Sequence, residues 1–266
     1  MEPAGIERKT CHSLDNLTIV YSVCGAGEPG LVFVHGGMAD RTFWNSQLEA
    51  FAKSSRTIAL DLAGHGESGW NRAKWGIPEF GADVRAVVEA EDLGRVVILG
   101  NSLGGPVAIE AALLMPDRTV GVVGVDTFQD LGRRIEPEEA RHQADAFGAD
   151  YPGTLKVMLR RLFHPDVDPD FMADIERRMA RPSPEVVRLM FLGLGGYDSG
   201  ASARKLNIPI RAVNGDLYPT DIEKIRTIKP DFDAVVMTHT GHYPMLEKPK
   251  EFNRLLAGVL VDLVRK

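Results

Sequence analysis

The sequence predicts an α/β fold in which a mostly parallel β-sheet is flanked by helices and interrupted by an inserted helical lid. Two observations lead to this prediction. Short apolar runs typical of buried strands alternate with helix-like segments in the first half of the chain, as in parallel sheets covered on both faces. After Asp126 the alternation stops and helix-like segments follow one another, until strand character returns near residue 208.

Each predicted element of the first half has its own pattern. Residues 17–24 are rich in β-branched side chains and alternate between apolar and polar positions, as a strand does. The other predicted strands are short apolar runs, at residues 30–34, 56–60, 96–99 and 120–125. Helix-like segments lie between them, at residues 44–52, 79–90 and 106–115. If the strand at residues 17–24 pairs with an earlier strand that contains Cys11, through a tight turn at Asp15 and Asn16, Cys11 lies opposite Val20.

The second half divides the chain into three parts. Residues 129–204 resemble successive helices separated by prolines, and this segment is too long for a loop. The last strands and helix are predicted at residues 208–213, 232–237 and 249–265. We therefore predict a core made of residues 1–127 and 206–266, covered by a lid made of residues 128–205.

The composition favours a globular protein without a nucleic-acid or membrane partner. The 266 residues are 44% hydrophobic with a formal net charge of −6, whereas nucleic-acid-binding domains usually carry a basic patch. No apolar run reaches the roughly 18 residues of a transmembrane helix, and the first residues lack the apolar core of a secretory signal. Cys11 and Cys24 lack zinc-ligand spacing, so we expect two reduced thiols in a cytoplasmic protein.

The strongest chemical signal is the pentapeptide Gly100-Asn101-Ser102-Leu103-Gly104, which lies between a predicted strand and a predicted helix. It matches the G-x-S-x-G pattern of a nucleophile elbow, where the turn is so sharp that its neighbours must be small. Such a turn exposes the Ser102 hydroxyl and directs the Leu103 N–H toward the place where a negative oxygen forms. We therefore predict that Ser102 is a nucleophile; the alternative is a glycine-rich helix start that binds phosphate.

Two further segments carry candidate site residues. The sequence His35-Gly36-Gly37 follows a predicted strand, and its glycines allow the backbone to approach a substrate closely. We predict that Gly37 supplies a second oxyanion N–H and that His35 shapes the loop. Near the other end of the chain, His242 lies on a loop after a late strand, so it can fold back beside a serine and take its proton. We predict that His242 is the general base of Ser102.

Together with the stretch DLAGHGES at residues 61–68, these motifs are highly specific. The chain resembles the α/β-hydrolase family over nearly its whole length, and in particular its capped, esterase-like members. The resemblance implies an enzyme that cleaves a small carboxylic ester through a Ser-His-Asp triad and an acyl-enzyme intermediate. It also implies a structural turn at residues 61–68, in which His65 has no assigned role.

Two aspartates are candidates for the acid of the implied triad. An acid fixes the tautomer of the histidine and stabilises its charged form. The family usually places it three residues after the glycine that closes the penultimate core strand, here Gly215, but that position holds Tyr218. Asp216 lies in the same loop, directly after the glycine. Asp126 ends an earlier strand, where a minority of the family resembling some dehalogenases carries its acid. Asp126 is favoured because its position needs no adjustment of a loop.

The apolar residues of the predicted lid have two interpretations. Most of them are expected to form the core of the lid, while some line a cavity that suits an apolar acyl or alcohol group. These residues are Phe128, Phe147, Met158, Phe163, Met190, Phe191 and Leu192. The charged pair Arg160 and Arg161 is interpreted as a solvated helix face.

Two other functions remain compatible with the same residues. A triad of this kind also supports hydrolysis of a C–C bond, cyanohydrin cleavage by a hydroxynitrile lyase, or cofactor-free perhydrolysis. A small-ligand receptor with slow turnover on a hydrolase scaffold is the third possibility, because a fold does not fix a function. A serine at the elbow argues against a haloalkane dehalogenase or an epoxide hydrolase, whose elbow carries an aspartate.

No metal or cofactor is expected. His35, His65 and His242 lie on separate predicted loops without metal-ligand spacing. No glycine-rich segment has the spacing of a dinucleotide fingerprint or a P-loop. The expected partner is therefore a small-molecule ester or a similar substrate. The sequence is also compatible with a homo-oligomer.

Overall fold

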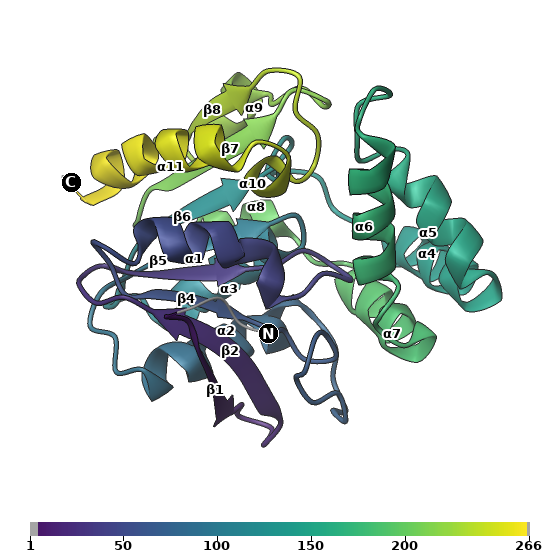
Figure 1. Ribbon diagram of the computed structural model, residues 1–266, viewed down its shortest axis with the longest axis horizontal. Helices are drawn as coiled ribbons and strands as arrows, with labels where there is room; N and C mark the ends of the chain where they lie inside the picture. The colour runs from purple at the N-terminus through teal and green to yellow at the C-terminus, as the bar shows by residue number, and fades with distance from the viewer. Residues whose placement is uncertain (1–4, 265–266) are drawn as a thin grey trace.

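The computed structural model describes residues 5–264, which form the predicted α/β architecture (Figure 1). Within these residues eight strands make one sheet, in the order β1-β2-β4-β3-β5-β6-β7-β8. Strand β2 runs antiparallel to both neighbours and all other neighbouring strands are parallel. The strands are β1 (Glu7–His12), β2 (Thr18–Cys24), β3 (Gly30–Val34), β4 (Thr57–Leu60), β5 (Val96–Asn101), β6 (Thr119–Val125), β7 (Ile210–Gly215) and β8 (Asp233–Met237). The predicted fold class is therefore confirmed.

The central strands are apolar because both faces of the sheet are covered. All residues of β3, β4 and β5 are buried. Helices α1 (Asn45–Phe51) and α11 (Pro249–Val264) lie on one face, and α2 (Ile77–Ala90) and α3 (Gly104–Leu114) lie on the other (Figure 1). The predicted end of the last helix at residue 265 lies outside the described residues.

The hairpin formed by β1 and β2 differs from the predicted register by one residue. Cys11 lies opposite Ile19 and not Val20. The connecting loop, residues 14–16, holds one residue more than predicted, and Asn16 adopts a left-handed φ of 62° in it. Asparagine tolerates this conformation better than most residues, which permits the longer turn. Both cysteines are free thiols.

Between β6 and β7 the chain forms four helices that lie together at one side of the sheet and its flanking helices, on the right in Figure 1. They are α4 (Pro137–Ala149), α5 (Tyr151–Leu159), α6 (Pro169–Met179) and α7 (Pro184–Leu194). Four of the prolines predicted to separate helices lie in the first turns of α4–α7, a position that suits proline, whereas Pro165 and Pro182 lie in the loops between helices. Asp150, Asp168 and Ser183 cap α5, α6 and α7 with side-chain oxygens that accept backbone N–H groups. We name α4–α7 and their connecting loops the helical insertion.

Three short helices complete the described chain: α8 (Ser199–Ala203), α9 (Ile222–Arg226) and α10 (Pro244–Glu247). A 3₁₀ turn, Arg41–Trp44, precedes α1. Within residues 5–264, no helix combines the length and the apolar character needed to cross a bilayer.

Candidate active site

Ser102 lies on a sharp turn between β5 and α3, as the elbow pattern predicts. Its φ of 52° is left-handed, a conformation that costs free energy in a non-glycine residue and is common at functional sites. A Cβ atom on Gly100 would lie 1.9 Å from the Gly104 carbonyl oxygen, and one on Gly104 would lie 2.4 Å from that of Val34. Glycine at both positions is therefore a steric requirement of the turn that presents Ser102.

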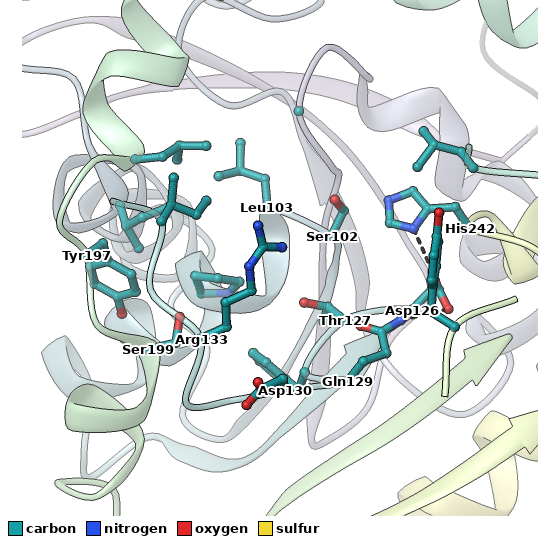
Figure 2. Close-up of a pocket in the computed structure, with 18 of the residues that line it drawn as sticks. Ser102, Leu103, Asp126, Thr127, Gln129, Asp130, Arg133, Tyr197, Ser199 and His242 are labelled. Atoms are coloured by element: carbon teal, nitrogen blue, oxygen red, sulfur yellow. Dashed lines mark hydrogen bonds and ion pairs between the residues drawn. The ribbon is translucent and has the colours of Figure 1, made fainter. Parts of the chain in front are cut away.

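The imidazole of His242 is held by Asp126. Its Nδ1 donates a hydrogen bond of 2.6 Å to Asp126 Oδ2. The other carboxylate oxygen of Asp126 accepts the Gly215 N–H at 2.9 Å and the Gln129 Nε2 at 3.1 Å. Figure 2 shows the His242 ring facing the Ser102 hydroxyl across the cavity. Because Nδ1 carries the proton given to Asp126, Nε2 is left as an acceptor for a serine proton.

Asp216, the other candidate acid, lies in a different contact. Its carboxylate accepts the backbone N–H of His239 at 2.7 Å and that of Thr240 at 3.1 Å, and His164 Nε2 donates to it at 3.0 Å. The structure thus brings Asp126, and not Asp216, to the His242 ring. Tyr218, at the position where the family usually has its acid, donates its hydroxyl to the Arg161 carbonyl oxygen.

Asp216 should make stability depend on pH in the acid range. The backbone N–H of His239, then that of Thr240 and the His164 imidazole, lower the pKa of Asp216 from 3.8 to about 2. Because the folded-state pKa lies below the unfolded value, the carboxylate stabilises the native state at neutral pH, and this contribution is lost as pH falls from about 4 to about 2. We expect Asp216→Asn to lower the melting temperature at neutral pH, with a difference from wild type that shrinks below about pH 4.

Thermal unfolding followed by circular dichroism between neutral pH and pH 3 measures this difference. Glu185→Gln is the matched control, because Glu185 forms an exposed ion pair with Arg188 within α7. A melting difference that stays constant as pH falls would show that the negative charge of Asp216 is not its source.

The two predicted oxyanion donors line the same cavity as Ser102. Gly37 and Leu103 are both among its wall residues, and Leu103 directly precedes α3. Among the described residues, neither backbone N–H has a protein acceptor, which leaves both available to a ligand. His35 instead braces its own loop: its Nε2 accepts the Leu62 N–H at 3.0 Å, and burial lowers its pKa, so the ring is neutral.

The cavity beside Ser102 has a volume of about 680 Å³ and mainly apolar walls. Its apolar lining includes Ile77, Pro106, Phe128, Met158, Met190 and Phe191. Of the seven apolar residues singled out in the predicted lid, Phe128, Met158, Met190 and Phe191 line this cavity, and Phe128 and Met190 are at the same time buried in the hydrophobic core. Phe147 and Phe163 are buried, and Leu192 is partly exposed. Arg160 and Arg161 are exposed and do not line it.

Three side chains that support the site were not identified from the sequence. Asn101 donates its amide to the Val125 carbonyl oxygen at 2.9 Å and to that of His242 at 3.0 Å. Gln129 holds Asp126 from the side opposite His242. The carboxylate of Glu247 accepts the N–H groups of the two residues that flank His242 in sequence, at 2.9 and 3.0 Å. Asn101 and Glu247 bind backbone groups, and Gln129 binds a side chain three residues away, so residue type alone gives no signal for these roles.

The described part of the chain contains no group of three or more His, Cys, Asp or Glu side chains arranged to hold a metal ion. The groups gathered at the cavity are a serine hydroxyl, an imidazole, a carboxylate and two free backbone N–H groups. This set matches nucleophilic acyl transfer, in which a base activates the nucleophile and backbone donors stabilise an oxyanion.

Two curated relatives match most of this chain. A dihydrolipoyllysine-residue acetyltransferase component of an acetoin cleaving system from Pseudomonas putida is 34% identical, with a match covering 90% of this chain and 65% of the relative. A pimeloyl-[acyl-carrier protein] methyl ester esterase from Aliivibrio fischeri is 24% identical, with 84% of this chain and 90% of the relative covered. The chain spans only 38–65% of the length of the first curated relatives that it matches.

The fold has close counterparts among solved structures. A thermophilic esterase from Thermogutta terrifontis, 25% identical, superimposes with a TM-score of 0.84 over 97% of this chain and 99% of the other. The family model described as "Alpha/beta hydrolase family" matches residues 31–255, which is most of the chain. The resemblance inferred from the motifs is thereby confirmed: the chain belongs to the α/β hydrolase family.

Proposed function

We propose that this protein is a serine hydrolase that cleaves small carboxylic esters, with Ser102 as nucleophile, His242 as general base and Asp126 as the acid. The observation that carries the proposal is the 2.6 Å contact between His242 Nδ1 and Asp126 Oδ2, in a ring that faces Ser102 (Figure 2). The esterases from T. terrifontis and A. fischeri support ester hydrolysis as the reaction. An intact nucleophile and base argue against a receptor without turnover.

In the proposed reaction, His242 Nε2 takes the Ser102 proton as the serine oxygen attacks the ester carbonyl. The N–H groups of Gly37 and Leu103 stabilise the resulting oxyanion. Collapse of the intermediate breaks the bond to the alcohol oxygen, which leaves with the proton held by His242, and the acyl group stays on Ser102. Water then adds to the acyl-enzyme with His242 as base, releasing the carboxylic acid and the free serine. Asp126 fixes the tautomer and stabilises the imidazolium.

We propose that the helical insertion acts as a lid that shapes the substrate cavity. Met158, Met190 and Phe191 come from its helices and line the cavity opposite the sheet. Methionine and aromatic side chains offer apolar surface, and methionine adapts its shape to the ligand. The preferred substrate therefore has an apolar acyl or alcohol group.

The proposal predicts a rising dependence of kcat/KM on acyl-chain length. With p-nitrophenyl acetate, butyrate and hexanoate, each added CH₂ that enters the apolar cavity contributes about 0.8 kcal/mol, or up to about fourfold in kcat/KM. The assay measures the rate at which the purified protein releases p-nitrophenol from each ester. The increase should stop when the chain reaches the end of the cavity.

No turnover of any ester in this series would contradict the proposed function. Turnover of a C–C bond substrate, a cyanohydrin or a peroxide would then point to another reaction of the same residues, and tight binding without turnover to a receptor. A Met190→Ala variant tests the cavity itself: we expect a lower preference for hexanoate over acetate, because truncation removes apolar contact with the longer chain.

A further inference from the structure

The loop between α5 and α6, residues 160–168, lies against the loop that carries His242. We name residues 160–168 the bracing loop and residues 238–243, which include His242, the histidine loop. The His242 N–H donates a hydrogen bond of 2.8 Å to the Leu162 carbonyl oxygen. A Cβ atom on Gly241 would lie 2.6 Å from the same oxygen, so the two backbones are in close contact. The helical insertion thus holds the main chain of the proposed base directly.

Asp216 lies between the two loops and contacts both. Its carboxylate accepts two backbone N–H groups of the histidine loop, from His239 and Thr240, and the Nε2 hydrogen of His164 in the bracing loop. The side chains of His164 and Asp216 are 22% and 36% exposed. A hydrogen bond to a charged acceptor is stronger than one between neutral groups. Asp216 therefore joins the insertion to the histidine loop three and two residues before His242.

An outer pair continues the same contact toward the solvent. His239 Nε2 donates to Asp166 Oδ2 at 2.9 Å, and the His164 and His239 rings stack with centroids 4.8 Å apart. The His239 and Asp166 side chains are 64% and 66% exposed. So exposed a contact contributes little, and the less exposed inner pair of His164 and Asp216 carries most of the attachment.

The other groups that hold His242 and the N–H groups next to it belong to the core. Asp126 holds the His242 ring, Asn101 holds its carbonyl oxygen, and Glu247 holds the N–H groups on either side of it. The His242 N–H is different because its acceptor, the Leu162 carbonyl oxygen, belongs to the insertion. Displacement of the bracing loop would break this hydrogen bond and leave the remaining anchors in place.

We propose that His164 and Asp216 are positioning residues that lock the bracing loop onto the histidine loop, so that His242 is correctly placed only while the helical insertion is docked. The proposal rests on the proposed function of Ser102 and His242. A catalytic group must be held within a fraction of an ångström of its working position, and a misplacement of about 1 Å can cost about a hundredfold in rate. The contact thus couples the closed position of the insertion to the competence of the base.

The test measures kcat and KM of His164→Ala, Asp216→Asn and the double variant on p-nitrophenyl butyrate. We expect kcat to fall about tenfold to a hundredfold with KM changed less than about threefold, because the base and not the substrate cavity is disturbed. The double variant should be no slower than the slower single variant, since both changes remove one contact. His164→Gln should retain most of the wild-type kcat, because its amide can donate to Asp216 in place of the imidazole.

His142→Ala and Asp145→Asn are the matched controls, because both residues are exposed on α4 of the same insertion. Their kcat should equal that of wild type. Unchanged kcat in both His164→Ala and Asp216→Asn, additive losses in the double variant, or a change in KM alone would overturn the proposal. A loss in Asp216→Asn without one in His164→Ala would restrict the effect to the core loop and would also contradict it.

Hydrogen–deuterium exchange separates this proposal from the proposed function, since it requires no turnover. In peptides covering residues 238–243, we expect faster exchange in His164→Ala and Asp216→Asn than in wild type, and wild-type rates in His142→Ala and Asp145→Asn. If wild type hydrolyses no ester while exchange changes as expected, the reaction is wrong and the loop attachment stands. Wild-type exchange in both His164→Ala and Asp216→Asn would overturn the attachment itself.

Discussion

Ester hydrolysis by the Ser102→Ala variant is expected to fall by on the order of 10⁴-fold or more in kcat. The methyl group that replaces the hydroxymethyl cannot form the acyl-enzyme, so the residual rate comes from the free N–H groups and substrate binding alone. Release of p-nitrophenol from the butyrate ester measures this rate. The strained turn at Ser102 accepts alanine with little change in packing, because the change removes one oxygen atom and keeps the Cβ atom.

Two measurements make the Ser102 result decisive. Ser46→Ala, at an exposed serine of α1, should keep the wild-type rate. A fluorophosphonate probe should add one phosphonyl group to wild type, on the peptide that contains Ser102, and none to Ser102→Ala. Full activity in Ser102→Ala, or labelling on a different serine, would show that the reaction uses another nucleophile.

Asp126→Asn is expected to lower kcat by about 10⁴-fold, whereas Asp216→Asn should cost no more than about a hundredfold. An asparagine at position 126 can present an N–H to His242 Nδ1, which favours the tautomer whose Nε2 carries the proton and cannot accept one from Ser102. It also removes the charge that stabilises the imidazolium. The carboxamide has nearly the same shape as the carboxylate, so the contacts with Gly215 and Gln129 need little adjustment.

The comparison of the two aspartates requires kcat for both variants on the same ester, with folding checked by circular dichroism. Gln129→Ala serves as an intermediate case, since it removes one of the groups that orient Asp126 and should cost far less than Asp126→Asn. If Asp216→Asn were the more damaging change by orders of magnitude, Asp216 would be the acid and the contact between Asp126 and His242 would be structural.

The strands and core helices could be predicted from the sequence because burial on both faces demands continuous apolar runs. The strand predicted at residues 30–34 has the same bounds as β3. The elbow was predicted because only glycine fits at positions 100 and 104. The hairpin register was wrong because one extra turn residue shifts every pair. Patterns along the chain carry this local steric information well.

The choice between Asp126 and Asp216 could not be made from the sequence, because it depends on contacts between loops far apart in the chain. Asp216 is surrounded by two backbone N–H groups of the histidine loop and by His164, which lies 52 residues away in sequence. The sequence also could not tell which apolar residues of the insertion line the cavity, for a related reason. Periodicity identifies an apolar face but does not say whether another helix or an open cavity lies opposite.

The pairing of β5 with β6 has a consequence for engineering. Asn101 lies opposite Val125 in adjacent parallel strands, so the residues that follow them, Ser102 and Asp126, keep a separation set by the spacing of the sheet, about 4.8 Å between strands. Replacing α4–α7 by a segment from a relative should therefore leave the nucleophile and its neighbouring carboxylate in place. A chimera intended to accept new substrates should keep residues 160–168 of the parent. A graft that lacks them would change the selectivity of the pocket but would also leave the His242 imidazole poorly held.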